Sequence, residues 1–140
     1  MLFKKFPKKS LGQNFLIDSN IVKKIVNVSN DIKNKTILEI GSGSGNLTTE
    51  ILSRKPKKVI AIEKDKNLSI LLKNRFVFNN NLRIINEDIM TILKKSNVEK
   101  NVIVFGNLPY NISTQILASL IMLKKWPPWY ESLIFMFQKE

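Results

Sequence analysis

The chain has 140 residues, of which 44% are apolar, which is enough for one domain with a single hydrophobic core. Lys and Arg number 23 against 11 Asp and Glu, and the formal net charge of +12 favours a polyanionic partner such as nucleic acid, unless it reflects compositional bias alone. The absence of Cys and His excludes a cysteine nucleophile, a histidine base, an ordinary zinc site and disulfides. No segment has the pattern of a signal peptide or a membrane span, so we expect a cytoplasmic protein.

The sequence divides into two units at residue 17. Residues 1–17 form a basic arm, which is either an RNA contact or a solvated tail, followed by the segment Gly-Gln-Asn-Phe-Leu at 12–16. The arm has lysines on both sides of Phe6, at Lys4, Lys5, Lys8 and Lys9. Residues 18–140 are expected to form one domain, in which Asp18 or Ser19 caps a first helix.

Beyond this helix, apolar runs alternate with helical patterns. Strands are predicted at residues 36–40, 59–62, 82–85, 102–105 and 132–137. Helices are predicted at residues 46–54, 66–76 and 89–95, and a further one is capped by Ser113 or Thr114 and broken by the Trp-Pro-Pro-Trp segment at 126–129. This alternation predicts an α/β fold with a mainly parallel, doubly wound sheet and right-handed crossovers. The last strand is apolar on both faces, as a central strand would be, so we expect more chain to follow it.

Three predicted strands are each followed by residues suited to an adenosine ligand. Gly41-Ser42-Gly43-Ser44-Gly45 follows the first strand, as a ligand loop or a structural turn. Glu63 follows the second strand at the distance expected of an acid that binds ribose hydroxyls, or it is a solvated acid. Asp88 follows the third strand, where it accepts a hydrogen bond from an adenine amine while Ile89 covers the ring, or it caps a helix.

Together these positions describe an adenosine-containing cofactor along one edge of the sheet. NAD and S-adenosylmethionine both fit that outline, but the third glycine comes one residue too early for the dinucleotide pattern. No lysine follows the loop in the form that a P-loop requires, which excludes ATP bound in that way. The sequence therefore favours S-adenosylmethionine.

Asn107-Leu108-Pro109-Tyr110 follows the fourth predicted strand and is the candidate catalytic segment. Asn107 and a neighbouring backbone carbonyl are able to accept both N–H bonds of an exocyclic amine, which would position its nitrogen for attack on a methyl group. Pro109 holds Leu108 extended, and Tyr110 is suited to stack on an extruded base. The alternative is an ordinary strand–turn–helix connection with a core tyrosine.

Six stretches of the chain resemble the rRNA adenine N6-dimethyltransferases, specifically the small-subunit branch of that family. They are residues 12–16, 39–45, 62–63, 87–88, 107–113 and 136–140, and they occur in the family's order across nearly the whole chain. One departure is Gly41-Ser42-Gly43, where the family commonly has Gly-Pro-Gly. The family also continues into further strands and a C-terminal helical domain, so the resemblance implies a doubly wound, Rossmann-like methyltransferase sheet truncated before those parts.

The resemblance implies dimethylation of two adjacent adenosines in the 3′-terminal hairpin of small-subunit rRNA, within a pre-30S particle, by a monomer that uses S-adenosylmethionine. In this cofactor site, Asn14 and Leu16 close over the ligand and Gly41 and Gly43 lie beside its methionine end. The resemblance also implies that Glu63 binds the ribose and that Asp88 and Ile89 contact the adenine. Asn107 would lie between the cofactor and the target amine, and Tyr110 would stack on the target base.

Three other functions compete with this one. The resistance-type large-subunit rRNA enzymes share the fold, but the residues at 111–114 and 138–140 favour the small-subunit branch. A non-catalytic nucleic-acid-binding relative is disfavoured because Glu63, Asp88 and Asn107 are all present. A DNA adenine methyltransferase usually has proline where Leu108 stands.

Overall fold

The computed structural model describes residues 18–95, 99–108 and 110–137, with the backbone alone for residues 110 and 111. Helices and strands alternate along these ranges: α1 (Ser19–Asn27), β1 (Thr36–Ile40), α2 (Asn46–Ser53), β2 (Lys58–Ile62), α3 (Lys66–Arg75), β3 (Leu82–Ile85), α4 (Ile89–Leu93), β4 (Val102–Leu108), α5 (Tyr110–Ile121) and β5 (Tyr130–Phe137). Within the described ranges, no helix combines the length and apolarity needed to cross a membrane. The predicted basic arm, Asn14, Leu16 and Pro109 lie outside these residues.

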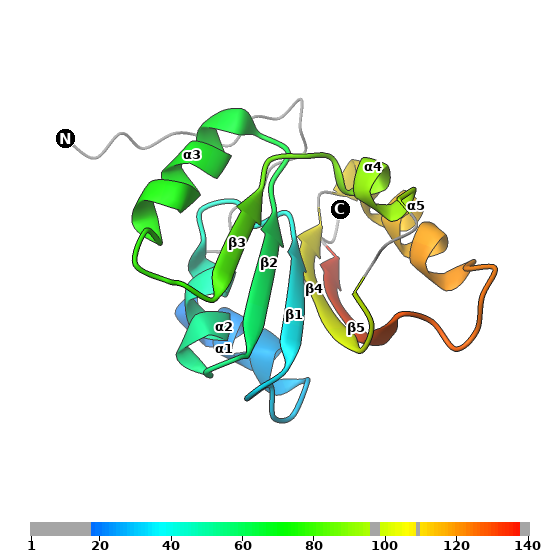
Figure 1. The fold of residues 1–140 in the computed structure, drawn as a ribbon, viewed down its shortest axis with the longest axis horizontal. Coiled ribbons are helices and arrows are strands. Elements are labelled where there is room, and N and C mark those ends of the chain that lie inside the picture. Colours follow the sequence, from blue (N-terminus) through cyan, green and yellow to red (C-terminus); the bar gives the residue numbers. More distant parts are fainter. Residues whose placement is uncertain (1–17, 96–98, 109, 138–140) are drawn as a thin grey trace.

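The described strands form one sheet in the order β3-β2-β1-β4-β5, and every neighbouring pair is parallel (Figure 1). This confirms the predicted parallel sheet. The chain builds outward from β1 to β3 and then crosses to β4 on the other side of β1, so the order reverses between β1 and β4. Ile40 is in register with Ile62 on β2 and with Gly106 on β4. The carboxyl ends of these strands therefore lie side by side at the reversal point, where ligands bind in open α/β sheets.

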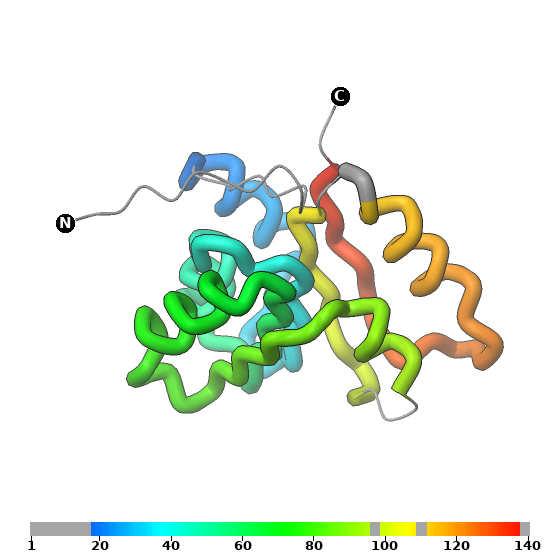
Figure 2. The backbone as a smooth tube through the Cα atoms, turned by 90° about the horizontal axis from the view of Figure 1, so that it is seen from above, coloured from blue at the N-terminus to red at the C-terminus, as the bar shows by residue number. Residues whose placement is uncertain are grey.

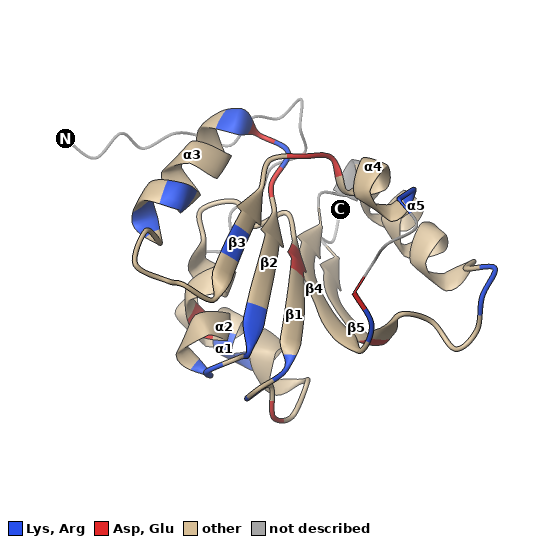
Figure 3. Ribbon diagram, viewed as in Figure 1, with Lys and Arg blue, Asp and Glu red and all other residues tan. Residues whose placement is uncertain are grey.

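Most of the charged residues lie on helices, turns and strand ends, but one acid lies inside the central strand β1 (Figure 3). The sequence of that strand identifies it as Glu39, which is only 1% exposed. Its neighbours Leu38 and Ile40 are apolar and buried, as expected for a strand with covered faces. A buried carboxyl in this position is unusual.

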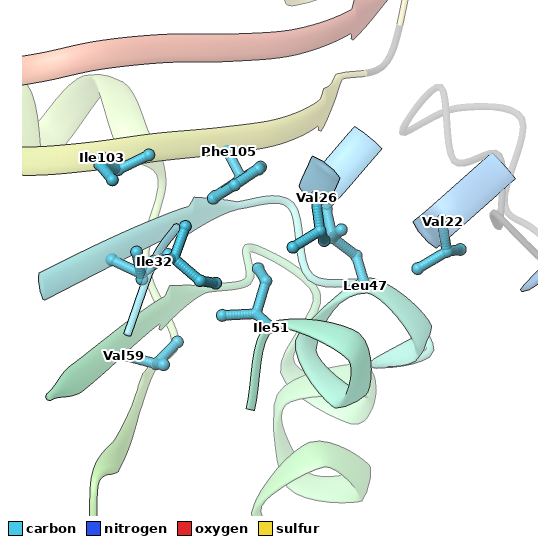
Figure 4. Close-up of a cluster of buried hydrophobic side chains, with 9 residues drawn as sticks. Val22, Val26, Ile32, Leu47, Ile51, Val59, Ile103 and Phe105 are labelled. Atoms are coloured by element: carbon cyan, nitrogen blue, oxygen red, sulfur yellow. The ribbon is translucent and has the colours of Figure 1, made fainter. Parts of the chain in front are cut away.

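Two clusters of buried apolar side chains cover the two faces of the sheet. The first joins β1, β2 and β4 to helices α1 and α2, through residues that include Val26, Ile51 and Phe105 (Figure 4). The second joins the other face to α4 and α5, through residues that include Ile89 and Ile116. Figure 2 shows α1 and α4 at opposite sides of the strands. Helices on both faces confirm the doubly wound architecture.

The predicted helix start at residue 18 is confirmed in detail. Asp18 has an extended backbone, and its Oδ1 accepts a hydrogen bond from Asn20 N at 2.9 Å. Asp65 caps α3 in the same way, through Leu68 N at 3.0 Å and Asn67 N at 2.8 Å. A carboxylate in this position accepts from backbone N–H groups that have no partner within the helix.

Strand β4 is longer than the sequence pattern predicted, because it continues past Phe105 to Leu108. Its added residues pair with β5, as far as Leu108 opposite Phe137. Gly106 permits this pairing, since a Cβ atom there would lie 2.9 Å from Leu108 Cδ2 and 3.1 Å from Phe135 Cδ1. Asn107 and Leu108 are therefore held by strand hydrogen bonding and do not lie in a loop after the strand.

The predicted caps Ser113 and Thr114 are wrong, because α5 already begins at Tyr110. Proline suits the start of a helix, where its missing N–H costs nothing, so Pro109 in the sequence was the better marker. The helix ends at Ile121, before the Trp-Pro-Pro-Trp segment that was predicted to break it. The Tyr130 hydroxyl donates to Leu120 O at 2.8 Å and satisfies one carbonyl of the last helical turn.

Strand β5 begins at Tyr130, two residues earlier than predicted, and lies at one edge of the described sheet. Most of its residues are half-buried, whereas the apolar pattern predicted a strand buried on both faces. In the described residues only β4 pairs with it, so its second edge has no neighbouring strand there.

Candidate functional site

An open pocket lies where the carboxyl ends of β1, β2 and β4 meet the turn after β3. About 590 Å³ of space lies within it, open solvent at its mouth included. Its lining includes residues that the sequence predicted to bind the ligand, from the ends of four strands. They are Gly41, Gly43, Glu63, Asp88, Ile89 and Asn107. Residues that are far apart in the sequence therefore meet in a single pocket.

The glycine loop after β1 needs its glycines for their backbone conformation. Gly41, Gly43 and Gly45 have φ angles of +73°, +56° and +87°, which side chains rarely permit. Gly41 N donates to Ile62 O at 2.8 Å, so the loop is fastened to the end of β2. A Cβ atom at Gly41 would lie 3.5 Å from the Asn107 carbonyl oxygen, which places the loop beside the candidate catalytic segment.

We expect the change Gly45→Ala to lower the free energy of unfolding by about 2 kcal/mol or more, because it adds backbone strain and a steric clash. The new Cβ atom would lie 2.8 Å from Leu72 Cδ2 and 2.9 Å from Phe76 Cε2. Urea denaturation would measure the loss. The control is Ser53→Ala at the exposed end of the same helix, which should change stability by less than about 0.5 kcal/mol. Equal stability of the two variants would contradict the strained geometry.

Glu63 is buried and fixed by backbone donors on both sides of its carboxyl group. Gly43 N donates to Oε2 and Asp65 N donates to Oε1, each at 2.8 Å. Burial raises the pKa of Glu63. The two backbone hydrogen bonds lower it by a smaller amount, and the nearby Asp65 carboxyl raises it slightly further. Since a carboxylate oxygen accepts more than one hydrogen bond, each oxygen still has capacity for a ligand hydroxyl. The predicted alternative of a solvated acid is not what the structure shows.

Asp88 has two roles in the structure, one of which is the helix cap that was the alternative interpretation. Its Oδ1 accepts from Met90 N at 2.9 Å and caps α4, while its Oδ2 pairs with Lys64 Nζ at 2.9 Å. The hydrogen bond from Lys64 and then that from Met90 lower the pKa of Asp88, so the group is a carboxylate at neutral pH. The cap and the ion pair hold this acceptor at the pocket, beside the buried side chain of Ile89.

Asn107 lies inside β4 and lines the pocket, in register with Met136 on β5. Leu108 is fully buried in the apolar cluster under α5. Residue 110 is the first residue of α5. The predicted catalytic segment therefore joins the end of a central strand to a helix, and its asparagine reaches the same pocket as the glycine loop.

Sequence reasoning missed the apolar wall of the pocket and one basic residue. The wall consists of Ile40, Ile62, Leu68, Ile112 and Ile116, and Lys64 and Glu87 also line the pocket. A signal was present for part of this set, because Ile40 and Ile62 are the last residues of strands whose ends were already assigned to the ligand. Nothing in the sequence pattern indicated that Lys64 would pair with Asp88.

A family model and the curated relatives of this chain point to the same protein family. A family model described as "Ribosomal RNA adenine dimethylase" matches residues 4–140. A small-subunit rRNA methyltransferase A of Pelagibacter ubique is 53% identical over 133 residues, covering 95% of this chain and 50% of that protein. The protein of the same name from Allorhizobium ampelinum is 42% identical over 95% of this chain and 49% of that protein. The chain thus spans about half the length of these curated relatives.

Solved structures agree with the fold. A dimethyladenosine transferase from Plasmodium falciparum has a TM-score of 0.72 and 32% identity, covering 90% of this chain and 44% of that one. The 23S rRNA methyltransferase ErmE also has a TM-score of 0.72, over 87% of this chain and 48% of that one, and at 23% identity it shows likeness of fold alone. With a family model that matches nearly the whole sequence, the chain belongs to the ribosomal RNA adenine dimethylase family.

Proposed function

We propose that this protein is an S-adenosylmethionine-dependent methyltransferase that converts two adjacent adenosines in the 3′-terminal hairpin of small-subunit rRNA to N6,N6-dimethyladenosine. It would act as a monomer on a pre-30S particle in the cytoplasm. The observation that carries the proposal is the single pocket in which the glycine loop, two fixed carboxyl groups and a strand-end asparagine meet. The high identity to small-subunit relatives supports this branch of the family.

The pocket fits an adenosyl cofactor. Both oxygens of Glu63 are oriented by backbone donors, so their remaining lone pairs are suited to the two ribose hydroxyls. Asp88 is ionised and suited to accept from the adenine amine, with the apolar side chains of Ile89 and Leu68 available to the ring. Gly41 and Gly43 leave room for the methionine end, since neither has a side chain.

Bound S-adenosylmethionine would supply an electrophilic methyl group, and the chain's own residues would position the acceptor. The Asn107 carboxamide oxygen would accept one N–H of the target adenine amine, which keeps the nitrogen lone pair available to attack the methyl carbon. Methyl transfer would exchange the carbon–sulfur bond for a carbon–nitrogen bond, and the amine proton would pass to solvent. No histidine or cysteine is needed for this chemistry.

The test is transfer of labelled methyl groups to 30S particles that lack the modification, by the protein expressed from its full reading frame. We expect label in the 3′-terminal hairpin, as two dimethylated adenosines. Label on 23S rRNA instead would favour the large-subunit branch. Absence of S-adenosylmethionine binding in calorimetry, with retained RNA binding, would favour the non-catalytic alternative.

A further inference from the structure

Glu39 is a buried ionisable group that neither the proposed chemistry nor a helix cap uses. Side chains alternate along β1, and Ile37 packs in the cluster under α1 and α2 whereas Leu38 and Ile40 pack in the cluster on the other face. Glu39 therefore points toward α2, away from the cofactor pocket. There the Thr48 hydroxyl, itself fully buried, donates to Glu39 Oε2 at 2.6 Å.

Glu39 precedes the glycine loop in the sequence and contacts the helix that follows the loop. The loop begins two residues after Glu39, and Thr48 lies in the first turn of α2, which begins directly after Gly45. Within the loop, the buried Ser42 hydroxyl lies near enough to Glu39 to favour its ionised form. One carboxyl group thus contacts the helix that follows the loop and approaches a residue inside it.

We propose that Glu39 is a positioning residue: its uncharged carboxyl group ties the glycine loop to α2, and loss of its proton loosens the loop and weakens cofactor binding. This inference rests on the proposed function for the identity of the cofactor. The contact with Thr48 and the burial of both side chains do not depend on that identity.

The surroundings of Glu39 disfavour a charge. Burial raises its pKa to about 8, against smaller lowering effects of the Thr48 and Ser42 hydroxyls, and the Glu63 carboxyl adds a still smaller increase. On the neighbouring strands the residues opposite are Ala61 and Phe105, which carry no charge. On α2, Glu50 and Arg54 pair with each other, and the α1 lysines Lys23 and Lys24 are exposed, so no described cation offsets a charge on Glu39.

The contribution of Glu39 to stability decreases as the pH rises. The pKa of Glu39 lies above that of an exposed glutamate, so its contribution to stability is complete at low pH and is lost as the pH rises through about 8. Above that pH the Thr48 hydroxyl binds the carboxylate more strongly, but the buried charge has no countercharge, and this larger cost is expected to draw water in between the loop and α2.

The test compares the wild-type chain with Glu39→Gln, which keeps a polar group of the same shape but does not ionise. For the wild type we expect the affinity for S-adenosylhomocysteine to be about tenfold lower at pH 9 than at pH 7, and the amide signals of Gly41 and Gly45 to shift with a midpoint near pH 8. Glu39→Gln should retain affinity at pH 7 and show neither change. The control Glu50→Gln, which changes another carboxyl group on α2, should behave like the wild type.

Thr48→Val provides a second variant, because it removes the hydroxyl that favours the carboxylate. Its midpoint should move to higher pH, and its affinity at pH 7 should fall. The inference is overturned if Glu39→Gln keeps the alkaline loss of affinity, or if the glycine signals do not titrate. Failure of every variant to bind S-adenosylhomocysteine would instead contradict the proposed cofactor, and the glycine signals would still decide the role of Glu39.

Discussion

Replacing Asn107 by alanine is expected to slow methyl transfer by about 100- to 1000-fold, because the side chain is proposed to align the target amine and not to bind it alone. Its place inside β4, paired with β5 and beside Gly41, fixes the asparagine more firmly than a loop would. The affinity for S-adenosylhomocysteine should change by no more than about threefold, so that the loss appears in the rate of the chemical step. Single-turnover transfer of labelled methyl groups to 30S particles measures that rate.

A matched control for this change is Asn81→Ala. The Asn81 side chain donates to Pro56 O at 3.1 Å, near the amino ends of β2 and β3 and away from the pocket. Its loss should leave methyl transfer near the wild-type rate. Methyl transfer by Asn107→Ala at the rate of this control would rule out the proposed role of the asparagine.

The sequence predicted the fold well because its signals are local and repeated. Each predicted strand is an apolar run, and Asp18 and Pro56 mark a helix start and a helix end by chemistry that acts over a few residues. The cofactor residues were predictable for a related reason. In a parallel sheet the residues that follow successive strands lie at the same edge. The sequence alone therefore predicted that Gly41, Glu63 and Asp88 lie in one site.

The wrong end of β4 and the contacts that were not predicted depend on tertiary packing, whereas the wrong start of α5 came from a local signal. The end of β4 depends on pairing with β5, which lies far along the chain, so the pattern around Gly106 looked like the end of a strand. The ion pair of Lys64 with Asp88 and the contact of Glu39 with Thr48 are likewise set by tertiary packing. Glu39 in particular stands in an apolar strand pattern where only the structure shows that its carboxyl group is buried.

The second large effect is expected for Glu63→Gln. Glu63 accepts hydrogen bonds from Gly43 N and Asp65 N, one on each carboxyl oxygen. Glutamine replaces one of these oxygens with an NH₂ donor, which must then face a backbone donor, and a ribose hydroxyl loses a charged acceptor. We expect the affinity for S-adenosylhomocysteine to fall by about 100-fold, a loss of roughly 3 kcal/mol, as measured by calorimetry.

Two controls separate ribose binding from damage to the glycine loop. Glu99→Gln changes an exposed carboxyl that pairs with Lys58 outside the pocket, and it should bind the ligand as the wild type does. The 2′-deoxy analogue of S-adenosylhomocysteine should bind the wild type more weakly than the parent ligand, whereas Glu63→Gln should bind the two almost equally. Because burial raises the pKa of Glu63, wild-type binding should also strengthen as rising pH ionises this carboxyl. A variant that still discriminates fully between the two ligands would show that Glu63 does not contact the ribose.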